Sequence, residues 1–453
     1  MRPRRLSDVA RAVEGSLVGD DAEVRAVATD SRDAAEGVLF VALVGERADG
    51  HRFVAEAFER GAAGAVVAGS VDAPGPTIRV GSTADALMRL AADERASMLA
   101  TVVGITGANG KTSTKDLAHA VVATRHRVHA SPGSFNNEVG LPMTILGAPA
   151  DTEVLVAEMG ARRLGDVKVL SGIARPDVVV VTNVGVAHME VFGSWASIVE
   201  ASAEPIDALA SSGVAVLNAD DPVAIGYAGR APGRVVTFGT RADADVRGED
   251  VELDRDGRAT FRLVAADVHL PVSLAVPGEH MVSNALAAVA VGLELDVDPT
   301  AAAAALGQAG VSRWRMETFT TADGVRVLND AYNANPESTA AALRTARWIA
   351  GDGRLLAVLG EMAELGPIAA DEHDRVGELA ARVRVDRLVT VGDAARAIAR
   401  AAIREGMDPS DVVSYGSAEE ASADVRGTAG PGDLVLCKGS RVAGLEAVAE
   451  ALR

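Results

Sequence analysis

The chain has 453 residues, 48% of them hydrophobic and 24% charged, which is typical of a folded protein with about three domains rather than a disordered one. Lysine and arginine total 44 against 63 aspartate and glutamate residues, so the net charge is −19 and we expect no binding to nucleic acid or to an anionic membrane. Only 3% of the residues are aromatic, so the cores must be aliphatic.

The sequence contains no segment that is typical of a secreted or membrane-inserted protein. Cys437 is the only cysteine, which excludes a disulfide within the chain and fits a reducing compartment. Asp8 and Arg11 lie where a signal peptide would be apolar, and no apolar run reaches the roughly 18 residues of a spanning helix. We therefore expect a soluble, cytoplasmic protein without membrane insertion.

Three units follow one another along the chain. The first, residues 1–98, mixes short β-type runs with helical stretches, the last of which is expected over Thr83–Ala100. The second, residues 99–312, alternates apolar strands with helices and then carries an antiparallel segment over Asp243–Val272. The third, residues 313–453, repeats the alternation of strands and helices. The sequence therefore predicts an α/β protein of three domains.

Continuous runs of Val, Leu and Ile between helices indicate parallel sheets that are covered on both faces. We predict a mostly parallel central sheet of this kind, a Rossmann-like α/β domain after it and a smaller α/β domain before it. The expected strands are Thr101–Thr106, Val154–Glu158, Val178–Thr182 and Ala215–Asn218 in the second unit, and Val325–Asn329, Leu355–Gly360, Arg387–Val391 and Asp433–Lys438 in the third.

The sharpest local signal follows the strand Thr101–Thr106. Glycines there let backbone N–H groups face phosphate oxygens, Lys111 can reach the β and γ phosphates, and the Thr112 hydroxyl can bind Mg²⁺. Only four of the 44 basic residues are lysines, so Lys111 carries more weight than usual. The spacing is GxxGKT, because Ile105 stands where the longer motif has its first glycine. A plain glycine turn is the alternative, but the order of strand, lysine and hydroxyls favours a phosphate-binding loop made of Gly107, Ala108, Asn109, Gly110, Lys111, Thr112 and Ser113.

Polar side chains also follow other predicted strands. Glu158 ends a buried strand, two strands from the loop, where a carboxylate is suited to hold Mg²⁺ on ATP; a helix N-cap is the alternative. His188 comes just after another strand, although a single histidine is more often structural. Asn136 and Asn137 lie in a glycine-bounded loop and, taken alone, are turn residues.

The motifs are more informative together than singly. In chain order they are GANGKTS, FNNEVGLP, EMGA, VGVAHME, NADDP, PGEHMVSNALAA and DAYNANPES. This order resembles the Mur ligase family, the ATP-dependent amide-bond ligases of peptidoglycan precursor synthesis. DAYNANPESTAAAL, VLGEMAELG and CKGSR are similar to its branch that adds D-alanyl-D-alanine to UDP-N-acetylmuramoyl-tripeptide. The resemblance extends from Asp30 to Arg441 and implies a part in cell wall biogenesis, and so in cell shape, cell division and the cell cycle.

The resemblance also implies where the substrates bind. The first domain is expected to hold the UDP part of the nucleotide substrate through its motif Asp30-Ser31-Arg32. The alternative is that this motif is only a turn with a surface salt bridge. The third domain is expected to bring two asparagines near the same reaction site. The implied substrate residues are Asp30, Ser31, Arg32, Asp49, His51, Asn333 and Asn335.

Around ATP and Mg²⁺ the resemblance assigns more residues. Thr112 and Glu158 are expected to hold one Mg²⁺, and His188 to help hold a second. Lys111, Glu158 and His188 are the expected catalytic residues. Besides the loop residues Gly107–Ser113, the expected contacts of ATP are Asn137 beside the nucleotide, His280 and Asn284 at the adenine, and Arg315 and Asp330, which close over the nucleotide from the third domain.

The implied reaction has two steps. The terminal carboxylate of the tripeptide attacks the γ-phosphorus of ATP to give an acyl phosphate and ADP, and the amine of the dipeptide then attacks the acyl carbon and displaces phosphate. Crowded anions require Lys111, arginines and metal ions to neutralise them. Closure of the third domain is expected to exclude water from the acyl phosphate. We expect small-molecule substrates as the only partners, and a monomer.

One position departs from the family pattern. Mur ligases commonly carry a carbamylated lysine after the AHxE segment, and an ungapped count from His188 places that position on Ser202. Serine forms no such stable carbamate, so we expect a second metal site that is built differently or is weaker. Glu200 or Glu204 could supply the missing carboxylate.

Three alternatives stay open at this point. A ligase that adds a diamino acid usually has a DNPR-type segment, where this chain has NANPES. A folylpolyglutamate synthetase lacks the first domain with its Asp30-Ser31-Arg32 motif. A non-catalytic relative that binds a UDP-muramyl peptide or ATP is supported only by Ser202, and the intact Lys111 argues against it.

Overall fold

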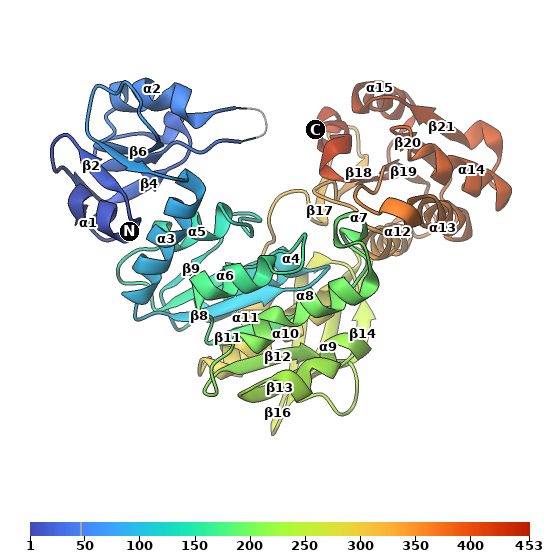
Figure 1. Cartoon of the computed structure of the whole chain (residues 1–453). Helices are drawn as coiled ribbons and strands as arrows, with labels where there is room; N and C mark the ends of the chain where they lie inside the picture. The colour runs from blue at the N-terminus through green and yellow to red at the C-terminus, as the bar shows by residue number, and fades with distance from the viewer. Residues whose placement is uncertain (46–47) are drawn as a thin grey trace.

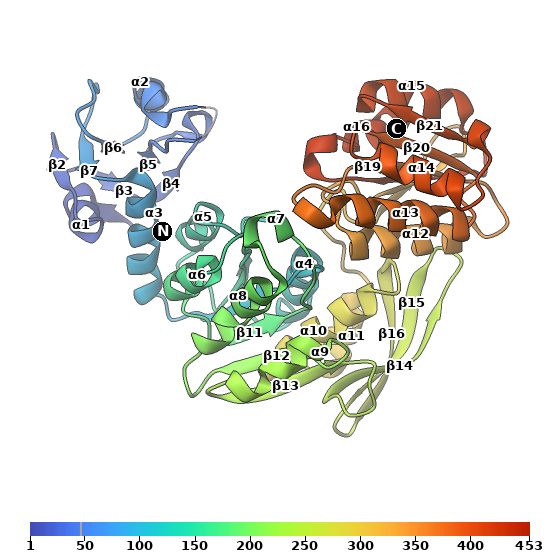
Figure 2. The same ribbon diagram turned by 45° about the vertical axis from the view of Figure 1, so that its right-hand side comes forward.

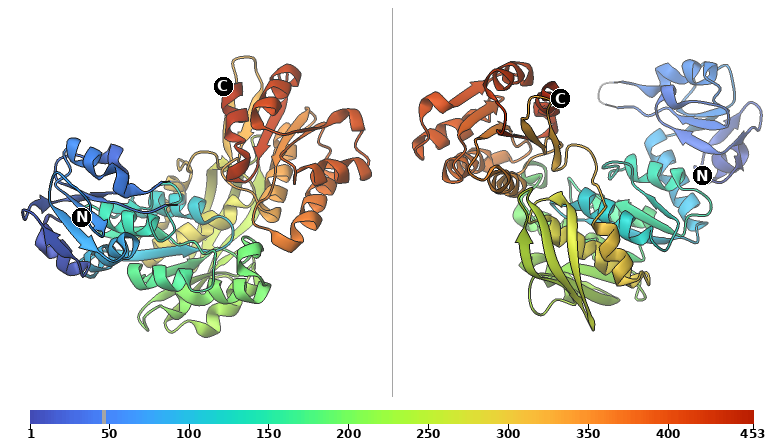
Figure 3. Two further views of the ribbon diagram at one scale, coloured as in Figure 1. Left: turned by 45° about the horizontal axis from the view of Figure 1, so that its top comes forward. Right: turned by 180° about the vertical axis from the view of Figure 1, so that it is seen from behind.

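The computed structural model describes residues 1–45 and 48–453 as three α/β domains, each built on its own main sheet. In Figures 1 and 3 the first and third domains lie apart from each other, and each of them packs against the central domain. Within the described residues, no helix is both long enough and apolar enough to span a membrane.

The first domain has a five-stranded sheet in the order β2-β7-β6-β5-β4, in which β4 to β7 run parallel and β2 pairs antiparallel with β7. Strands β1 and β3 form a separate antiparallel pair. Its elements are β1 (Arg4–Arg5), α1 (Leu6–Ala12), β2 (Ser16–Val18), β3 (Glu23–Val24), β4 (Ala26–Ala28), β5 (Val38–Val41), α2 (Val54–Glu59), β6 (Gly64–Ala68), β7 (Thr77–Val80) and α3 (Thr83–Ala96).

The central domain has a nine-stranded sheet in the order β16-β15-β14-β13-β12-β11-β8-β10-β9. Pairing is parallel from β9 to β14 and antiparallel in the meander β14-β15-β16. Its elements are β8 (Thr101–Thr106), α4 (Lys111–Val122), β9 (Val128–Ala130), α5 (Gly140–Gly147), β10 (Val154–Glu158), α6 (Asp166–Ala174), β11 (Val178–Val181), α7 (Met189–Phe192), α8 (Trp195–Asp207), β12 (Val214–Asn218), α9 (Pro222–Gly226), β13 (Arg234–Gly239), β14 (Val246–Leu253), β15 (Arg258–Ala265), β16 (Val268–Pro277), α10 (Met281–Glu294) and α11 (Pro299–Leu306).

The third domain has a six-stranded sheet in the order β17-β18-β22-β19-β20-β21, parallel except for the edge strand β17. Figure 2 shows its helices on both faces of the sheet. Its elements are β17 (Glu317–Thr320), β18 (Arg326–Asn329), α12 (Pro336–Ala350), β19 (Leu355–Gly360), α13 (Ala369–Arg382), β20 (Arg387–Val391), α14 (Arg396–Arg404), β21 (Val412–Tyr415), α15 (Ala418–Thr428), β22 (Leu434–Lys438) and α16 (Glu446–Leu452).

The central sheet is buried on both faces because successive side chains of a strand point in opposite directions. Val103 packs in the core that holds α4 and α10, whereas Val102 packs in the core that holds α5 and α6. The second of these cores also contains Leu87 and Leu90 of α3, so the first domain is joined to the central one by shared apolar packing.

The predicted fold class is confirmed, and four of the eight predicted strands have the bounds that we expected: β8, β10, β19 and β20. The helix predicted over Thr83–Ala100 ends earlier, at Ala96. In the second and third domains, strands β9, β13, β17 and β21 were not predicted. The domain boundaries near residues 98 and 312 stay a proposal; they fall between the three main sheets, in segments without strands.

Candidate active site

The phosphate-binding loop lies where β8 ends and α4 begins. Gly107 and Gly110 have φ values of 133° and 80°, which are conformations that residues with a side chain rarely adopt. A Cβ atom at Gly107 would collide with Thr182, and one at Gly110 would collide with the amide of Asn284. Both glycines are therefore required by the backbone and by the close packing beneath it.

Two residues after β11 hold the backbone of the loop. The Thr182 hydroxyl donates to the carbonyl of Asn109 at 2.7 Å, and the Asn183 side-chain oxygen accepts from the Asn109 N–H at 2.8 Å. The N–H of Ala108 also donates to the Asn183 carbonyl at 3.0 Å. Neither residue was predicted to hold the loop, although their place at the end of a strand beside β8 was a usable signal.

Lys111 begins α4 and its side chain folds back over the loop. Its Nζ donates to the carbonyl of Gly107 at 2.7 Å and of Ala108 at 3.2 Å. Loss of hydration lowers the pKa of Lys111, with the Glu158 carboxylate opposing and Arg315 adding to the shift. An incoming phosphate would offer this ammonium group a stronger, charged acceptor in place of the two carbonyls.

Glu158 lies beside the loop, at the end of β10. It accepts from the Thr112 hydroxyl at 2.8 Å and from the Asn136 amide at 2.7 Å, and it is only 1% exposed. These contacts disfavour the helix N-cap alternative. Strand β10 pairs directly with β8, so our expectation that Glu158 lies two strands from the loop was wrong.

Thr112 and Glu158 form a donor set that fits Mg²⁺. Mg²⁺ prefers oxygen ligands and is usually held by one or two carboxylates together with phosphates of the substrate. Among the residues that the structure describes, no three His, Cys, Asp or Glu side chains gather into a metal-binding group. The two protein oxygens therefore fit an ion that is completed by phosphate and water.

Only one of the two loop asparagines points into the site. Asn136 contacts Glu158, whereas the Asn137 side chain accepts from the backbone N–H groups of Val139 and Gly140 at 3.2 and 2.8 Å. Asn137 is exposed and shapes its own turn. The structure thus places Asn136 at the carboxylate, and Asn137, which the sequence analysis chose, at the entry to α5.

The two residues expected at the adenine lie in different surroundings. Asn284, in α10, is 6% exposed and lies under the loop, where its side-chain oxygen accepts from the Thr114 hydroxyl at 3.2 Å. His280 is exposed and precedes α10. The surrounding protein lowers the pKa of His280, against the effect of Asp330 from the third domain.

The third domain reaches the loop through Asn335. The Asn335 amide, 8% exposed, donates to the side-chain oxygen of Asn109 at 2.7 Å, and its oxygen caps α12. The Arg315 guanidinium stacks on the Tyr332 ring, 4.1 Å from its centroid, and the Tyr332 hydroxyl contacts Ser134 of the central domain.

Asp330 and Asn333 are tied together within the third domain. Asp330 pairs with Lys438 at 2.5 Å and accepts from the N–H of Met316 at 3.1 Å. Lys438 also donates to the carbonyl of Asn333, whose side chain is exposed. Lys438, one of the four lysines, therefore orders the DAYNAN segment. This role of Lys438 was not predicted.

His188 meets the third domain at another point. It has a left-handed backbone with φ 60°, and its Nδ1 contacts the carboxylate of Glu364. Burial lowers the pKa of His188 from its ordinary value, while the Glu364 carboxylate acts in the opposite direction. Glu364 was not predicted, because only the fold brings it to His188.

The structure does not support the proposed replacement for the carbamylated lysine. Glu200 is exposed and pairs with Arg230 at 2.8 Å, and the carboxylate of Glu204 accepts from the backbone N–H groups of Gly165 and Lys168 at 2.6 and 2.8 Å. Both carboxylates are thus engaged away from Glu158 and His188. These contacts disfavour either carboxylate as a metal ligand, because each side chain has a partner on a neighbouring segment of the central domain.

The first-domain motif Asp30-Ser31-Arg32 forms a turn with a surface ion pair. This arrangement is the one expected if the motif is only a structural turn and not a nucleotide-binding motif. The Arg32 guanidinium binds Asp30 at 2.5 Å and holds the pKa of that carboxyl down at about 2. The Ser31 hydroxyl donates to Glu56 at 3.2 Å. Contact of this motif with a nucleotide stays a prediction.

Asp49 and His51 hold the first domain together. His51 Nε2 accepts from the N–H of Ala68 at 2.8 Å, which leaves Nδ1 to donate to Asp49 at 2.7 Å. Asp49 also accepts from the backbone N–H of His51 and so caps the turn at Gly50–Phe53. These contacts fasten the loop after β5 to β6.

Comparison with known proteins places these features in a family. The Mur ligase middle domain matches residues 105–292, and the Mur ligase, glutamate ligase domain matches residues 314–441. The chain is 42% identical to the UDP-N-acetylmuramoyl-tripeptide--D-alanyl-D-alanine ligase of Mycobacterium tuberculosis, over 99% of this chain and 97% of that protein.

Solved structures agree with the sequence relatives. A crystal structure of MurF from Acinetobacter baumannii has a TM-score of 0.89 at 29% identity and covers 99% of this chain and 98% of its own. MurF from Thermotoga maritima in complex with ADP has a TM-score of 0.81 at 29% identity, over 95% and 97% of the two chains. This chain therefore belongs to the Mur ligase family, in its MurF branch.

Proposed function

We propose that this chain is the ATP-dependent ligase that joins D-alanyl-D-alanine to UDP-N-acetylmuramoyl-tripeptide and forms ADP and phosphate. The observation that carries this proposal is the convergence of Lys111, Thr112 and Glu158 on one phosphate-binding loop that Asn335 of the third domain also reaches. The full-length similarity to ligases of this name supports the choice of substrates.

The proposed first step places the tripeptide carboxylate and the triphosphate of ATP side by side. Their like charges repel, so the step needs positive charge that is already positioned. Lys111 supplies one such charge beside the loop, and Arg315 is close enough to lower the pKa of Lys111. The loop N–H groups add fixed dipoles that point toward phosphate.

Mg²⁺ fits the oxygens of Thr112 and Glu158, and when bound it would neutralise charge on the phosphates of ATP. Asn136 holds Glu158 in place through its amide. His188 is kept largely uncharged by its lowered pKa, so its ring can act as a ligand or hydrogen-bond partner.

The proposed acyl phosphate must be protected from water until the amine arrives. The third domain contributes to this protection because it touches the central domain at Asn109, Ser134 and His188. In the second step the amine attacks the acyl carbon, the C–O bond to phosphate breaks and the amine loses a proton.

The remaining substrate contacts extend the proposal to the first domain. Asp30, Ser31 and Arg32 would hold the UDP part of the substrate once Arg32 exchanges Asp30 for a phosphate oxygen. We also propose that the protein acts as a monomer. Because the reaction consumes ATP, we propose the cytoplasm as its compartment.

The test is phosphate release from ATP with purified substrates. Release should require both UDP-N-acetylmuramoyl-tripeptide and D-alanyl-D-alanine, and a free amino acid should be a far poorer amine. Turnover of UDP-muramyl-dipeptide with meso-diaminopimelate would move the assignment to a diamino-acid ligase. Binding without any phosphate release would favour a non-catalytic relative.

A further inference from the structure

A cavity of about 1140 Å³ lies at the contact between the central and third domains, away from the phosphate-binding loop. We call it the seam cavity. Figure 2 shows the far ends of β14 and β15 reaching α12 of the third domain, which is where it forms. Its lining comes from the end of β14 and the turn after it, from the start of β18, from α12 and the segment after it, and from the end of α13 and the segment after it.

The seam cavity is strongly basic in a chain that is strongly acidic overall. Six arginines line it against three aspartates, Asp254, Asp352 and Asp386, so its lining carries 6 − 3 = +3 while the whole chain carries −19. Like charges gathered in one place repel, so a bound anion would relieve the repulsion. The arginines are Arg255, Arg326, Arg344, Arg347, Arg382 and Arg384.

Half of these arginines have partners within the protein. Arg347 pairs with Asp386 at 3.3 Å, Arg382 pairs with Glu405 at 2.8 Å, and Arg326 donates to the carbonyl of Ile349 at 2.9 Å. Within residues 1–45 and 48–453, no hydrogen bond or ion pair is formed by the side chains of the other three, Arg255, Arg344 and Arg384. Three guanidinium groups are thus open to a ligand.

The open arginines come from both sides of the domain contact. Arg255 belongs to the turn between β14 and β15, whereas Arg344 lies in α12 and Arg384 follows α13. The turn is anchored to α12, since the Trp348 indole donates to the carbonyl of Asp254 at 2.8 Å and Gly257 packs closely on Ile349. Arginines from both domains are therefore held around one space.

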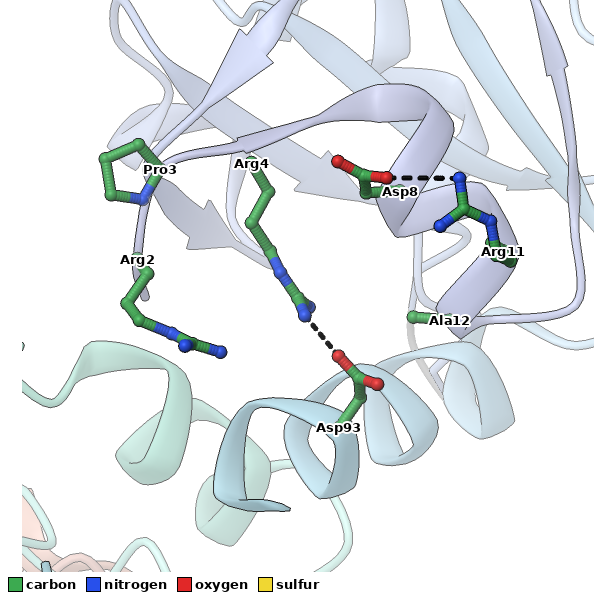
Figure 4. Close-up of a pocket in the computed structure, with 7 residues that line it drawn as sticks. All are labelled: Arg2, Pro3, Arg4, Asp8, Arg11, Ala12 and Asp93. Atoms are coloured by element: carbon green, nitrogen blue, oxygen red, sulfur yellow. Dashed lines mark hydrogen bonds and ion pairs between the residues drawn. The ribbon is translucent and has the colours of Figure 1, made fainter. Parts of the chain in front are cut away.

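A second cavity provides a comparison in which arginines are already paired with carboxylates. Figure 4 shows this cavity of about 620 Å³ near the N-terminus, where Arg4 pairs with Asp93 and Arg11 pairs with Asp8 at 3.2 Å. There Arg4 and Arg11 each already have a carboxylate partner. The seam cavity differs because three of its guanidinium groups are left over.

We propose that the seam cavity binds a multivalent phosphate anion, of the diphosphate or triphosphate class, between the central and third domains. Arginine suits this ligand because its planar fork makes paired, charge-assisted hydrogen bonds to phosphate. Trp348, which is 53% exposed at the same place, offers a flat face to the base of a nucleotide. An anion that bridges the two sides favours the domain arrangement in which Asn335 meets Asn109.

The test counts binding sites with labelled inorganic pyrophosphate by equilibrium dialysis of the full chain at 0.15 M NaCl, an ionic strength that screens weak surface attraction. The wild type should show a site at the seam cavity in addition to those expected at the phosphate-binding loop and at Arg32 of the first domain. Arg255→Ala and Arg344→Ala should each weaken the seam-cavity site about tenfold, because each removes a charged hydrogen bond from a different domain. Arg400→Ala removes an exposed arginine outside the cavity and is the matched control.

Lys111→Ala separates the site at the loop from the seam-cavity site. This variant should weaken only the site at the loop. The seam-cavity site, which Arg344→Ala weakens, should keep its affinity in Lys111→Ala. The proposal is overturned if Arg344→Ala leaves every site of the wild type unchanged, if Arg400→Ala has the same effect as Arg344→Ala, or if only one of the two seam variants weakens binding. The readout is binding, so it succeeds or fails separately from the ligase activity.

Two further ligands distinguish the sources of the phosphate group. In the Lys111→Ala protein, UDP and ADP are compared with pyrophosphate at the site that Arg344→Ala weakens, because UDP is also expected to bind the first domain. Equal affinities would show that the phosphates alone are recognised, and tighter binding of a nucleotide would show that the base uses the Trp348 face. Both outcomes support an anion site, whereas absence of binding by all three contradicts it.

Discussion

The amide of Asn335 donates to the side-chain oxygen of Asn109 at 2.7 Å, and this bond joins the first turn of α12 to the phosphate-binding loop. The same side chain accepts from the N–H of Ser338 at 2.9 Å and so caps α12. One residue thus fixes the start of a helix in the third domain and reaches the loop in the central domain.

The two roles of Asn335 can be separated by substitution. Asn335→Ser keeps an oxygen for the cap but is too short to donate to Asn109, so the midpoint of thermal unfolding should stay within a few degrees while kcat/KM falls. Asn335→Ala should lose the cap as well, at a cost of about 1 kcal/mol in the free energy of unfolding. Arg400→Ala, at an exposed arginine of the third domain that has no part in the proposed site, is the control. Equal activity of Asn335→Ser and wild type would contradict the role at the loop.

Lys111→Ala should reduce phosphate release by at least about a hundredfold, because a positioned charge near the transferred phosphate is lost. The fold should be unchanged, since the loop glycines and the bonds from Thr182 remain. Lys111→Arg should not restore activity, because a planar fork does not replace a compact ammonium group. Lys168→Ala, at an exposed lysine, is the control. Near-normal turnover of Lys111→Ala would refute the assignment of the loop.

Much of this site could be predicted because its residues follow apolar strands. The strand that ends at Glu158 and the strand before Gly107 are visible as runs of buried residues, and parallel strands bring their carboxyl ends to one edge. What the pattern left open was the direction of single side chains. Asn136 and Asn137 are adjacent and chemically identical, and only the path of the loop decides which one reaches Glu158.

Contacts between distant segments could not be predicted for a different reason. Glu364 meets His188 across 176 residues of sequence, and no local periodicity encodes that distance. Glu200 and Glu204 lie one helical turn apart, yet one faces Arg230 and the other faces the start of α6. Their partners come from separate segments, so the sequence of α8 alone could not assign them.

Glu204→Ala should destabilise the protein. Its carboxylate is 9% exposed and accepts from two backbone N–H groups at the start of α6, so its loss leaves both donors unsatisfied. We expect a loss of about 2 kcal/mol in the free energy of unfolding, measured by urea denaturation. Glu200→Ala removes an exposed ion pair and should change this free energy by less than about 1 kcal/mol. Neither change should raise the Mg²⁺ concentration needed for half activity; a rise would restore the idea of a metal ligand.

Ser202 predicts activity that does not depend on carbon dioxide. A lysine carbamate forms reversibly from carbon dioxide, whereas Ser202 lies beside the Tyr227 hydroxyl and has no amine. Phosphate release should therefore be the same after carbon dioxide is stripped and after bicarbonate is added. Ser202→Lys could create a bicarbonate response and is the informative comparison. Wild-type activity that follows bicarbonate would show that another amine is carbamylated.

Cys437 should be unreactive in the folded protein. Burial raises the pKa of its thiol to about 12 from an ordinary value of 9.0, so almost no thiolate is present at pH 8. Between these two values the native state holds a proton that the unfolded state releases, so the contribution of Cys437 to the free energy of unfolding should fall by about 1.4 kcal/mol per pH unit above pH 9, as a comparison with Cys437→Ala would show. A thiol reagent at pH 8 should react with one group only after denaturation. Rapid reaction of the native protein would contradict the burial of this strand.

The most direct measurement follows oxygen from the tripeptide into phosphate. UDP-N-acetylmuramoyl-tripeptide is labelled with ¹⁸O in both oxygens of its terminal carboxylate and is converted with ATP and D-alanyl-D-alanine. An acyl phosphate intermediate predicts one ¹⁸O atom in each released phosphate, because the attacking carboxylate oxygen leaves with phosphorus, and one ¹⁸O atom in the new amide. Phosphate without ¹⁸O, or phosphate released without formation of the pentapeptide, would contradict the proposed ligase.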